Sequence, residues 1–245
     1  MPRGFVCLAY HRVTDDPAAQ RDSYTVSPAR FRAQMGWLAQ HGWQGMGISE
    51  ALHAPRRRAI ALSFDGGYAD FAEHAWPVLH RYGFRATLFV VAARAGRAAD
   101  WPGAEGAPLL GWVALRLLAE QGLEIGSHGL TSMPLDALSP VEARANLSIA
   151  YVITARQIGQ PPVGLAYPFG RHTGEVVQAA QAAGFRWACT AWGGRNRTTT
   201  PRFMLRRTLV AGRDGPVRFA LKVWSGSARP GDLLRGLRRE PGSLR

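Results

Sequence analysis

Short apolar runs alternate with helical segments along almost the whole chain, and this alternation constrains the fold more than any other feature. Most of the runs are continuously apolar, as expected for parallel strands that are buried on both faces. The alternation predicts the α/β class, and seven such strands suit a barrel. The predicted strands are Phe5–Tyr10, Ala59–Phe64, Ala86–Val91, Leu123–Ser127, Val163–Tyr167, Trp187–Thr190 and Leu205–Val210.

Helix start signals lie between these runs. Ser27-Pro28 precedes a predicted helix at Ala29–His41, Ser139-Pro140 precedes one at Val141–Ile158, and Gly174 precedes one at Glu175–Ala183. The alternation of apolar runs and helical segments stops after Gly212. We therefore predict a barrel domain over residues 1–212 and a helical, basic tail over residues 213–245 that packs on the barrel or extends from it.

The net charge of +13 comes almost entirely from arginine, since Lys222 is the only lysine. The arginines are scattered, and no basic stripe with interleaved aromatic residues is present, so we expect no nucleic-acid partner. A solvated basic surface is the simplest interpretation, and a weak contact with an anionic partner or membrane surface stays open.

Cellular location is predicted from the cysteines and from the start of the sequence. Cys7 and Cys189 both lie in apolar runs, which favours buried, reduced thiols. The apolar segment Phe5–Tyr10 is too short for a signal peptide, and no apolar run approaches the ~20 residues of a membrane-spanning helix. We expect a cytoplasmic protein without a transmembrane segment.

Polar residues follow several predicted strands at the point where each strand ends. The carboxyl ends of parallel barrel strands meet at one rim, where barrel enzymes place their chemistry. Several reactive residues at matching positions are harder to explain as structure than a single one would be. They are His11 after the first strand, Asp65 after the second, His128 after the fourth, Tyr167 to Arg171 after the fifth and Trp192 after the sixth.

The segments around these residues carry a family resemblance. ALSFDGGYADF, EIGSHGLTSMPL and LAYPFG occur in that order, with AYHRV before them, YGFRATLFV after the first and GGRNRTTTPRFMLRR near the end. Over residues 4–210 the chain resembles the polysaccharide deacetylase family, also called the NodB-homology or carbohydrate esterase family 4 group. The resemblance implies a distorted (β/α) barrel. It also implies hydrolysis of an N-acetyl amide on a sugar, with a divalent metal such as zinc polarising the carbonyl and activating water.

The chain departs from the family pattern at the metal site. The resemblance makes Asp65 the general base and His128 a metal ligand, but the other two ligand positions hold Gly66 and Ser132. Glycine has no side chain and a serine hydroxyl is a poor ligand, so His128 alone would not hold zinc well. Three outcomes stay open: a site completed by His11, Asp65 or Asp70, a metal-independent enzyme in which carboxylate and imidazole activate water, or an inactive binding domain.

Further residues are predicted to line the substrate pocket. Tyr167 and Trp192 offer aromatic faces to a sugar, Pro168 and Arg171 belong to the same loop as Tyr167, and Arg206 is expected to orient the base. We predict a hydrolase acting on the acyl amide or ester of a sugar or sugar-like metabolite, with altered or absent metal dependence. The alternative is a catalytically inactive carbohydrate- or partner-binding domain on the same fold.

Overall fold

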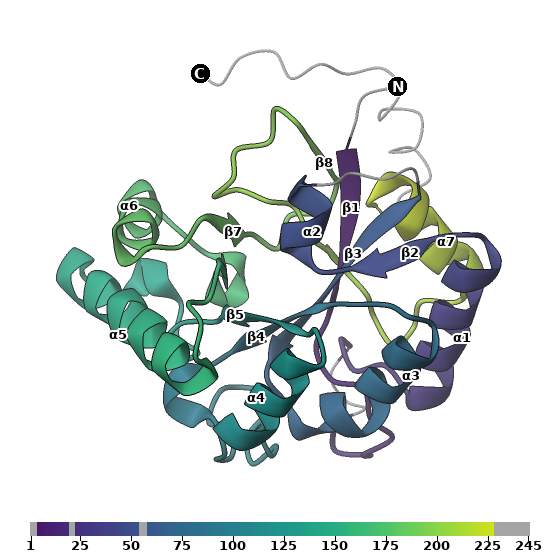
Figure 1. The fold of residues 1–245 in the computed structure, drawn as a ribbon, viewed down its shortest axis with the longest axis horizontal. Helices are drawn as coiled ribbons and strands as arrows, with labels where there is room; N and C mark the ends of the chain where they lie inside the picture. The colour runs from purple at the N-terminus through teal and green to yellow at the C-terminus, as the bar shows by residue number, and fades with distance from the viewer. Residues whose placement is uncertain (1–3, 20–22, 54–57, 228–245) are drawn as a thin grey trace.

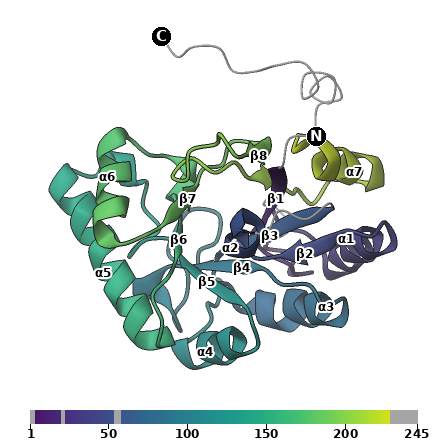
Figure 2. The ribbon, with the colours of Figure 1, turned by 45° about the horizontal axis from the view of Figure 1, so that its top comes forward.

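The strands of the computed structural model form one curled sheet with helices around its outside (Figures 1 and 2). The structure describes residues 4–19, 23–53 and 58–227. The strands are β1 (Gly4–Tyr10), β2 (Gln44–Met46), β3 (Ala59–Gly66), β4 (Thr87–Val90), β5 (Glu124–Ser127), β6 (Gly164–Ala166), β7 (Trp187–Cys189), β8 (Arg195–Arg197) and β9 (Thr208–Leu209). The α-helices are α1 (Pro28–Gln40), α2 (Ile48–His53), α3 (Trp76–Arg81), α4 (Trp112–Glu120), α5 (Pro140–Ile158), α6 (Gly174–Ala183) and α7 (Pro216–Ser225). Short helical turns are η2 (Phe71–Ala75), η3 (Ala92–Arg94), η4 (Leu135–Ala137) and η5 (Pro168–Gly170).

The strand order is β7-β6-β5-β4-β3-β1-β8, and β2 and β9 pair with β3 and β1 respectively. All pairs are parallel except that of β1 with β8. Thus the carboxyl ends of β1, β3, β4, β5, β6 and β7 share one rim. The segment predicted as the strand Leu205–Val210 is a strand only at Thr208–Leu209, beside β1, because Leu205 forms an isolated bridge with Cys189 of β7. This change of partner links β1 to β7 and gives the distorted barrel.

Two sets of side chains leave β1 and β3 in alternation, as the period of a strand requires. Val6, Leu8 and Tyr10 of β1 join one core cluster with residues of α1, α3, α4 and α7, whereas Phe5 and Cys7 join a second cluster. In β3, Ala59 and Ala61 belong to the second cluster. Asp65 follows them on the same face of the strand, so the strand period directs its carboxylate to the face that carries the second cluster.

The helices begin and end close to their predicted positions. At α5, Ser139 accepts a hydrogen bond from the Glu142 N–H while the Glu142 side chain accepts one from the Ser139 N–H, which satisfies two otherwise unpaired donors. The helix ends at Gly159, whose φ of +84° suits glycine. At α6 the N-cap is Thr173, one residue before the predicted Gly174.

The start of the predicted tail packs on the barrel. Phe219 and Val223 of α7 are buried in the first core cluster, and Lys222 forms a buried ion pair with Asp214. The rest of the tail, residues 228–245, lies outside the described residues. Within the described part of the chain, no helix is long and apolar enough to cross a membrane.

Candidate active site

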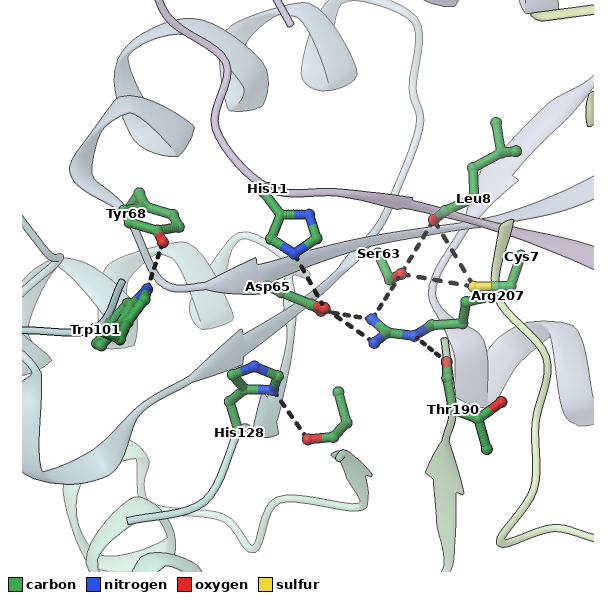
Figure 3. Close-up of polar contacts among 11 residues, drawn as sticks. Cys7, Leu8, His11, Ser63, Asp65, Tyr68, Trp101, His128, Thr190 and Arg207 are labelled. Carbon is green, nitrogen blue, oxygen red and sulfur yellow. Dashed lines mark hydrogen bonds and ion pairs between the residues drawn. The ribbon is translucent and has the colours of Figure 1, made fainter. Parts of the chain in front are cut away.

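A cavity of about 880 Å³ opens at the rim formed by the carboxyl ends of the strands. Of the residues predicted from the sequence, His11, Asp65 and His128 line it together, and Gly66 and Ser132 lie on its wall. His11 comes from the segment after β1, Asp65 from the end of β3 and His128 from the segment after β5. Figure 3 shows the two imidazoles on two sides of the Asp65 carboxylate.

Asp65 is held by a buried arginine, Arg207. The Arg207 Nη1 and Nη2 atoms donate to the two carboxylate oxygens at 2.5 and 2.9 Å, and Arg207 Nε donates to the Thr190 carbonyl at 3.2 Å (Figure 3). Burial alone would raise the pKa of Asp65, but Arg207, and then His128 and His11, lower it to about 2. Asp65 is therefore a fixed negative charge at neutral pH.

His128 is buried and neutral. Its Nδ1 lies 2.9 Å from the Ala166 carbonyl oxygen, which can only accept, so Nδ1 carries the proton and Nε2 is left as an acceptor. Burial lowers the pKa of His128 to about 4, against the opposing effect of the Asp65 carboxylate. The site thus holds an imidazole in one defined tautomer.

His11 completes the cluster on a less buried side. Its Nε2 lies 4.0 Å from Asp65 Oδ2, and the exposed fraction of its side chain is 29%. The Tyr24 ring stacks on the imidazole, with ring centroids 5.3 Å apart and an angle of 26° between the planes. A proton donor at this position would have access to solvent.

The residues present do not fit the metal that the family pattern implies. Gly66 supplies no donor, its φ is +98°, and a Cβ placed on it would lie 2.5 Å from the Tyr68 ring. The Tyr68 hydroxyl in turn accepts a hydrogen bond from Trp101 Nε1 at 2.9 Å (Figure 3). Asp65 is already paired with Arg207, and Asp70 with Arg12. Among the described residues, no three His, Cys, Asp or Glu side chains are grouped to hold a metal ion.

The loops after β6 and β7 place the predicted substrate residues differently from our expectation. Tyr167 is fully buried in a core cluster, where its hydroxyl donates to the Phe203 carbonyl, and Pro168 is also buried. Arg171 is exposed and pairs with Asp136. Neither these three residues nor Trp192 lines the cavity. Trp192 is nevertheless 54% exposed, directly after Ala191, which does line it.

Two other residues, Arg207 and Phe169, take the places expected for Arg206 and Tyr167. Arg207, and not Arg206, orients Asp65, since the Arg206 side chain is exposed and its Nη1 donates to the Gly193 carbonyl at 3.5 Å. Phe169 lines the cavity and is 53% exposed, whereas Tyr167, which was expected to offer its aromatic face to the sugar, is buried. Phe169 adopts φ +58°, unusual for a bulky residue, and this turn directs its ring outward.

A loop that the sequence did not single out forms another wall of the cavity. Residues 97–109 fold back on themselves through the bridge between Ala98 and Pro108, and Tyr68 pairs with Leu109. Seven consecutive residues after Trp101 line the cavity with it. The paired glycines Gly103 and Gly106 within WPGAEGAP were the available signal for such a turn-rich loop.

A family model described as polysaccharide deacetylase matches residues 53–188, more than half of the chain. The chain belongs to this family. The Bacillus subtilis (strain 168) protein YxkH, whose name places it among polysaccharide deacetylases, is 25% identical over 216 residues, covering 86% of this chain and 72% of YxkH. The poly-beta-1,6-N-acetyl-D-glucosamine N-deacetylase of Staphylococcus aureus (strain MSSA476) is 20% identical over 249 residues, covering 90% of this chain and 83% of that protein.

Solved structures share the fold of this polysaccharide deacetylase. The Streptococcus pyogenes deacetylase PplD superposes with a TM-score of 0.78 at 21% identity, covering 91% of this chain and 99% of PplD. IcaB from Ammonifex degensii superposes with a TM-score of 0.74 at 23% identity, covering 89% and 94% of the two chains. The predicted family and the distorted (β/α) barrel are confirmed. The predicted enzyme class is confirmed at the level of the family, which consists of carbohydrate deacetylases that hydrolyse amide bonds.

Proposed function

We propose that this protein removes an acyl group from the amide of an amino sugar or a sugar-like metabolite, and that it does so without the family's usual metal. The observation that carries the proposal is the convergence of Asp65, His11 and His128 on one cavity at the carboxyl rim of a deacetylase barrel. The donor set around them supports metal independence, because the two other ligand positions hold Gly66 and Ser132.

Water activation is assigned to the imidazole of His128. Both Asp65 oxygens already accept hydrogen bonds from Arg207, whereas His128 Nε2 is an acceptor at neutral pH. In the proposed reaction, Nε2 accepts a proton from the attacking water as its oxygen bonds to the acyl carbon. The Asp65 carboxylate stabilises the imidazolium that forms.

His11 is the proposed proton donor to the departing amine. It faces Asp65 from the side opposite His128 and is partly accessible to solvent, so it can be reprotonated after each turnover. Donation to the nitrogen lets the carbon–nitrogen bond break and releases a neutral amine. The acyl group leaves as a carboxylic acid.

Aromatic rings provide the proposed sugar contacts. Phe169 on the cavity wall and Trp192 beside it are both about half exposed, and each can stack on the apolar face of a sugar ring. The loops that carry them touch, since a Cβ placed on Gly170 would lie 2.5 Å from Ala191 Cβ. Tyr167, Pro168, Arg171 and Arg206 are not assigned to substrate contacts.

The test is acetate release from N-acetylated and O-acetylated sugars, from monomers to short oligomers. The protein is assayed as purified, after removal of metal with a chelator, and after addition of zinc. We expect turnover of at least one substrate that survives chelation and changes less than ~2-fold with zinc. Activity that disappears on chelation and returns with one zinc per chain would overturn metal independence.

A glycan-binding domain without activity is the second candidate, and the missing donors at Gly66 and Ser132 favour it. It predicts that acetylated oligomers bind by calorimetry but release no acetate under any metal condition. We also propose a cytoplasmic location, which the free, buried thiols of Cys7 and Cys189 support.

A further inference from the structure

We infer that Asp70 is a positioning residue, which fixes the loop that presents His11 to Asp65; the inference rests on the proposed function of the site. Asp70 was considered above only as a metal ligand. It is 6% exposed and lies immediately before η2, five residues after Asp65.

The Asp70 carboxylate contacts the two residues that follow His11. Its Oδ2 accepts a hydrogen bond from Arg12 Nε at 2.7 Å, and its Oδ1 accepts one from the Val13 N–H at 3.2 Å. One side chain therefore fixes both a side chain and the backbone of the His11 loop. A charged acceptor makes both bonds stronger than a neutral one would.

The same segment of chain supplies Asp65 and this anchor. The Arg12 guanidinium also lies over the Tyr68 ring, 5.6 Å from its centroid, and Tyr68 lies between Asp65 and Asp70 in sequence. On its other side the loop is held by the strand-like pair with Val26, whose N–H donates to the Arg12 carbonyl at 3.0 Å. His11 Nε2 lies 4.0 Å from Asp65 Oδ2. A shift of about 1 Å in this loop would therefore change the distance between the imidazole and the carboxylate by a large fraction.

Asp214 provides a matched control for a purely structural role. It is also a buried carboxylate that accepts one backbone N–H, from Ala211 at 2.7 Å, and forms a buried ion pair with Lys222. Its second cation, Arg218, is half exposed and lies 3.6 Å away, much as Asp16 lies beside Arg12 at the Asp70 anchor. It does not line the cavity. Asp70→Asn and Asp214→Asn thus remove the same kind of interaction at two places in the fold.

The experiment compares the steady-state kinetics and thermal melts of the two variants on the substrate found for the wild type. We expect Asp70→Asn to lower kcat ~10–100-fold with less than ~2-fold change in KM, and Asp214→Asn to lower the melting temperature with kcat within ~2-fold of wild type. In a His11→Ala background, Asp70→Asn should have no further effect on kcat. A loss that multiplies with that of His11→Ala, or an equal loss of kcat in Asp214→Asn, would overturn the inference.

Two measurements keep the inference testable if these variants fail. If Asp70→Asn does not fold, Arg12→Met removes the other partner and should give the same loss of kcat. If the wild type hydrolyses nothing, the proposed function fails, and the His11 ring signals in NMR spectra decide the positioning role. These signals should move in Asp70→Asn and stay in place in Asp214→Asn; signals that stay in place in both variants would contradict the role of Asp70.

Discussion

The two sides of the cavity are built in opposite ways. On the side of β1 and β3, Asp65 and Arg207 are 4% and 2% exposed, and their charges are paired with each other. On the side of the loops after β6 and β7, Phe169 and Trp192 present more than half of their surface to solvent. Charges fixed before the substrate arrives need no reorganisation during the reaction, whereas exposed rings gain most when a ligand covers them. The first side is thus suited to chemistry and the second to binding.

Asp65→Asn should have the largest effect on turnover. Asparagine keeps the size of the side chain but removes the charge that stabilises an imidazolium, so we expect kcat to fall ~10²–10⁴-fold. The measurement is acetate release by the wild type and the variant.

The variant must be assayed where it is folded, because it leaves the buried Arg207 guanidinium without a counter-ion. Circular dichroism melts supply that control. If folded Asp65→Asn retains most of the activity, the chemistry does not depend on this carboxylate, and the division between the two sides of the cavity fails.

Arg207→Met should have the largest effect on stability. It leaves the Asp65 carboxylate buried without its partner, and breaking a buried pair in this way costs ~3–5 kcal/mol. Arg206→Met, at the exposed neighbouring position, should change the free energy of unfolding by less than ~0.5 kcal/mol. Urea unfolding of both variants measures the difference, and similar values for the two arginines would mean that the Asp65–Arg207 pair is not a structural element.

The strands show which parts of the fold the sequence can and cannot predict. The strands from β1 to β7 with continuous apolar runs were predicted to within about one or two residues at most ends, because burial on both faces leaves a direct mark on composition. β2 and β8 were missed, since Gln44–Met46 and Arg195–Arg197 are short and partly polar, and their pairing with other strands makes them strands. Such pairing is a tertiary effect without a local signal.

In the site, the motifs were sufficient for Asp65, His11 and His128 but not for their surroundings. Strand alternation favours Arg207 over Arg206 as the partner of Asp65. Leu205 belongs to the same core cluster as residues of β1 and β3, and Arg207, two residues later, falls on the same face of an extended chain. The sequence carries no signal that Phe169, rather than Tyr167, would line the cavity. It depends on the positive φ of Phe169, which a bulky residue adopts only when the surrounding structure imposes it.

The pH dependence of stability should separate His128 from Asp65. The pKa of His128 falls from an ordinary 6.5 to about 4 in the folded protein, so the unfolded state binds more protons between these values. Its contribution is therefore complete above about pH 6.5 and is lost as the pH falls to about 4, with a total of ~3 kcal/mol. Asp65, whose pKa falls from 3.8 to about 2, contributes above pH 3.8 and loses this contribution toward pH 2.

Urea unfolding between pH 7 and pH 4 measures the first of these windows. His128→Asn should flatten the slope in this range. A slope that is unchanged in the variant would assign the titration to other groups and remove the basis for a buried, neutral imidazole.

The smallest predicted effect tests the binding side of the cavity. Trp192 is 54% exposed, and its ring makes a tilted contact with His172, with centroids 5.4 Å apart. A stacked sugar should gain ~1 kcal/mol from the ring, so Trp192→Ala should raise KM about 5-fold and leave kcat and the melting temperature nearly unchanged. Trp224→Ala is the matched control, since Trp224 is 47% exposed on α7 and, unlike Trp192 beside Ala191, has no sequence neighbour that lines the cavity. The Trp192 backbone carbonyl accepts a hydrogen bond from the Arg207 N–H at 3.0 Å. If the substitution distorted the loop that carries Trp192, it would therefore also disturb the Arg207–Asp65 pair and lower kcat. A variant that lowers kcat with unchanged KM would therefore assign Trp192 to the support of the charged side, and only a selective rise in KM keeps it as a sugar contact.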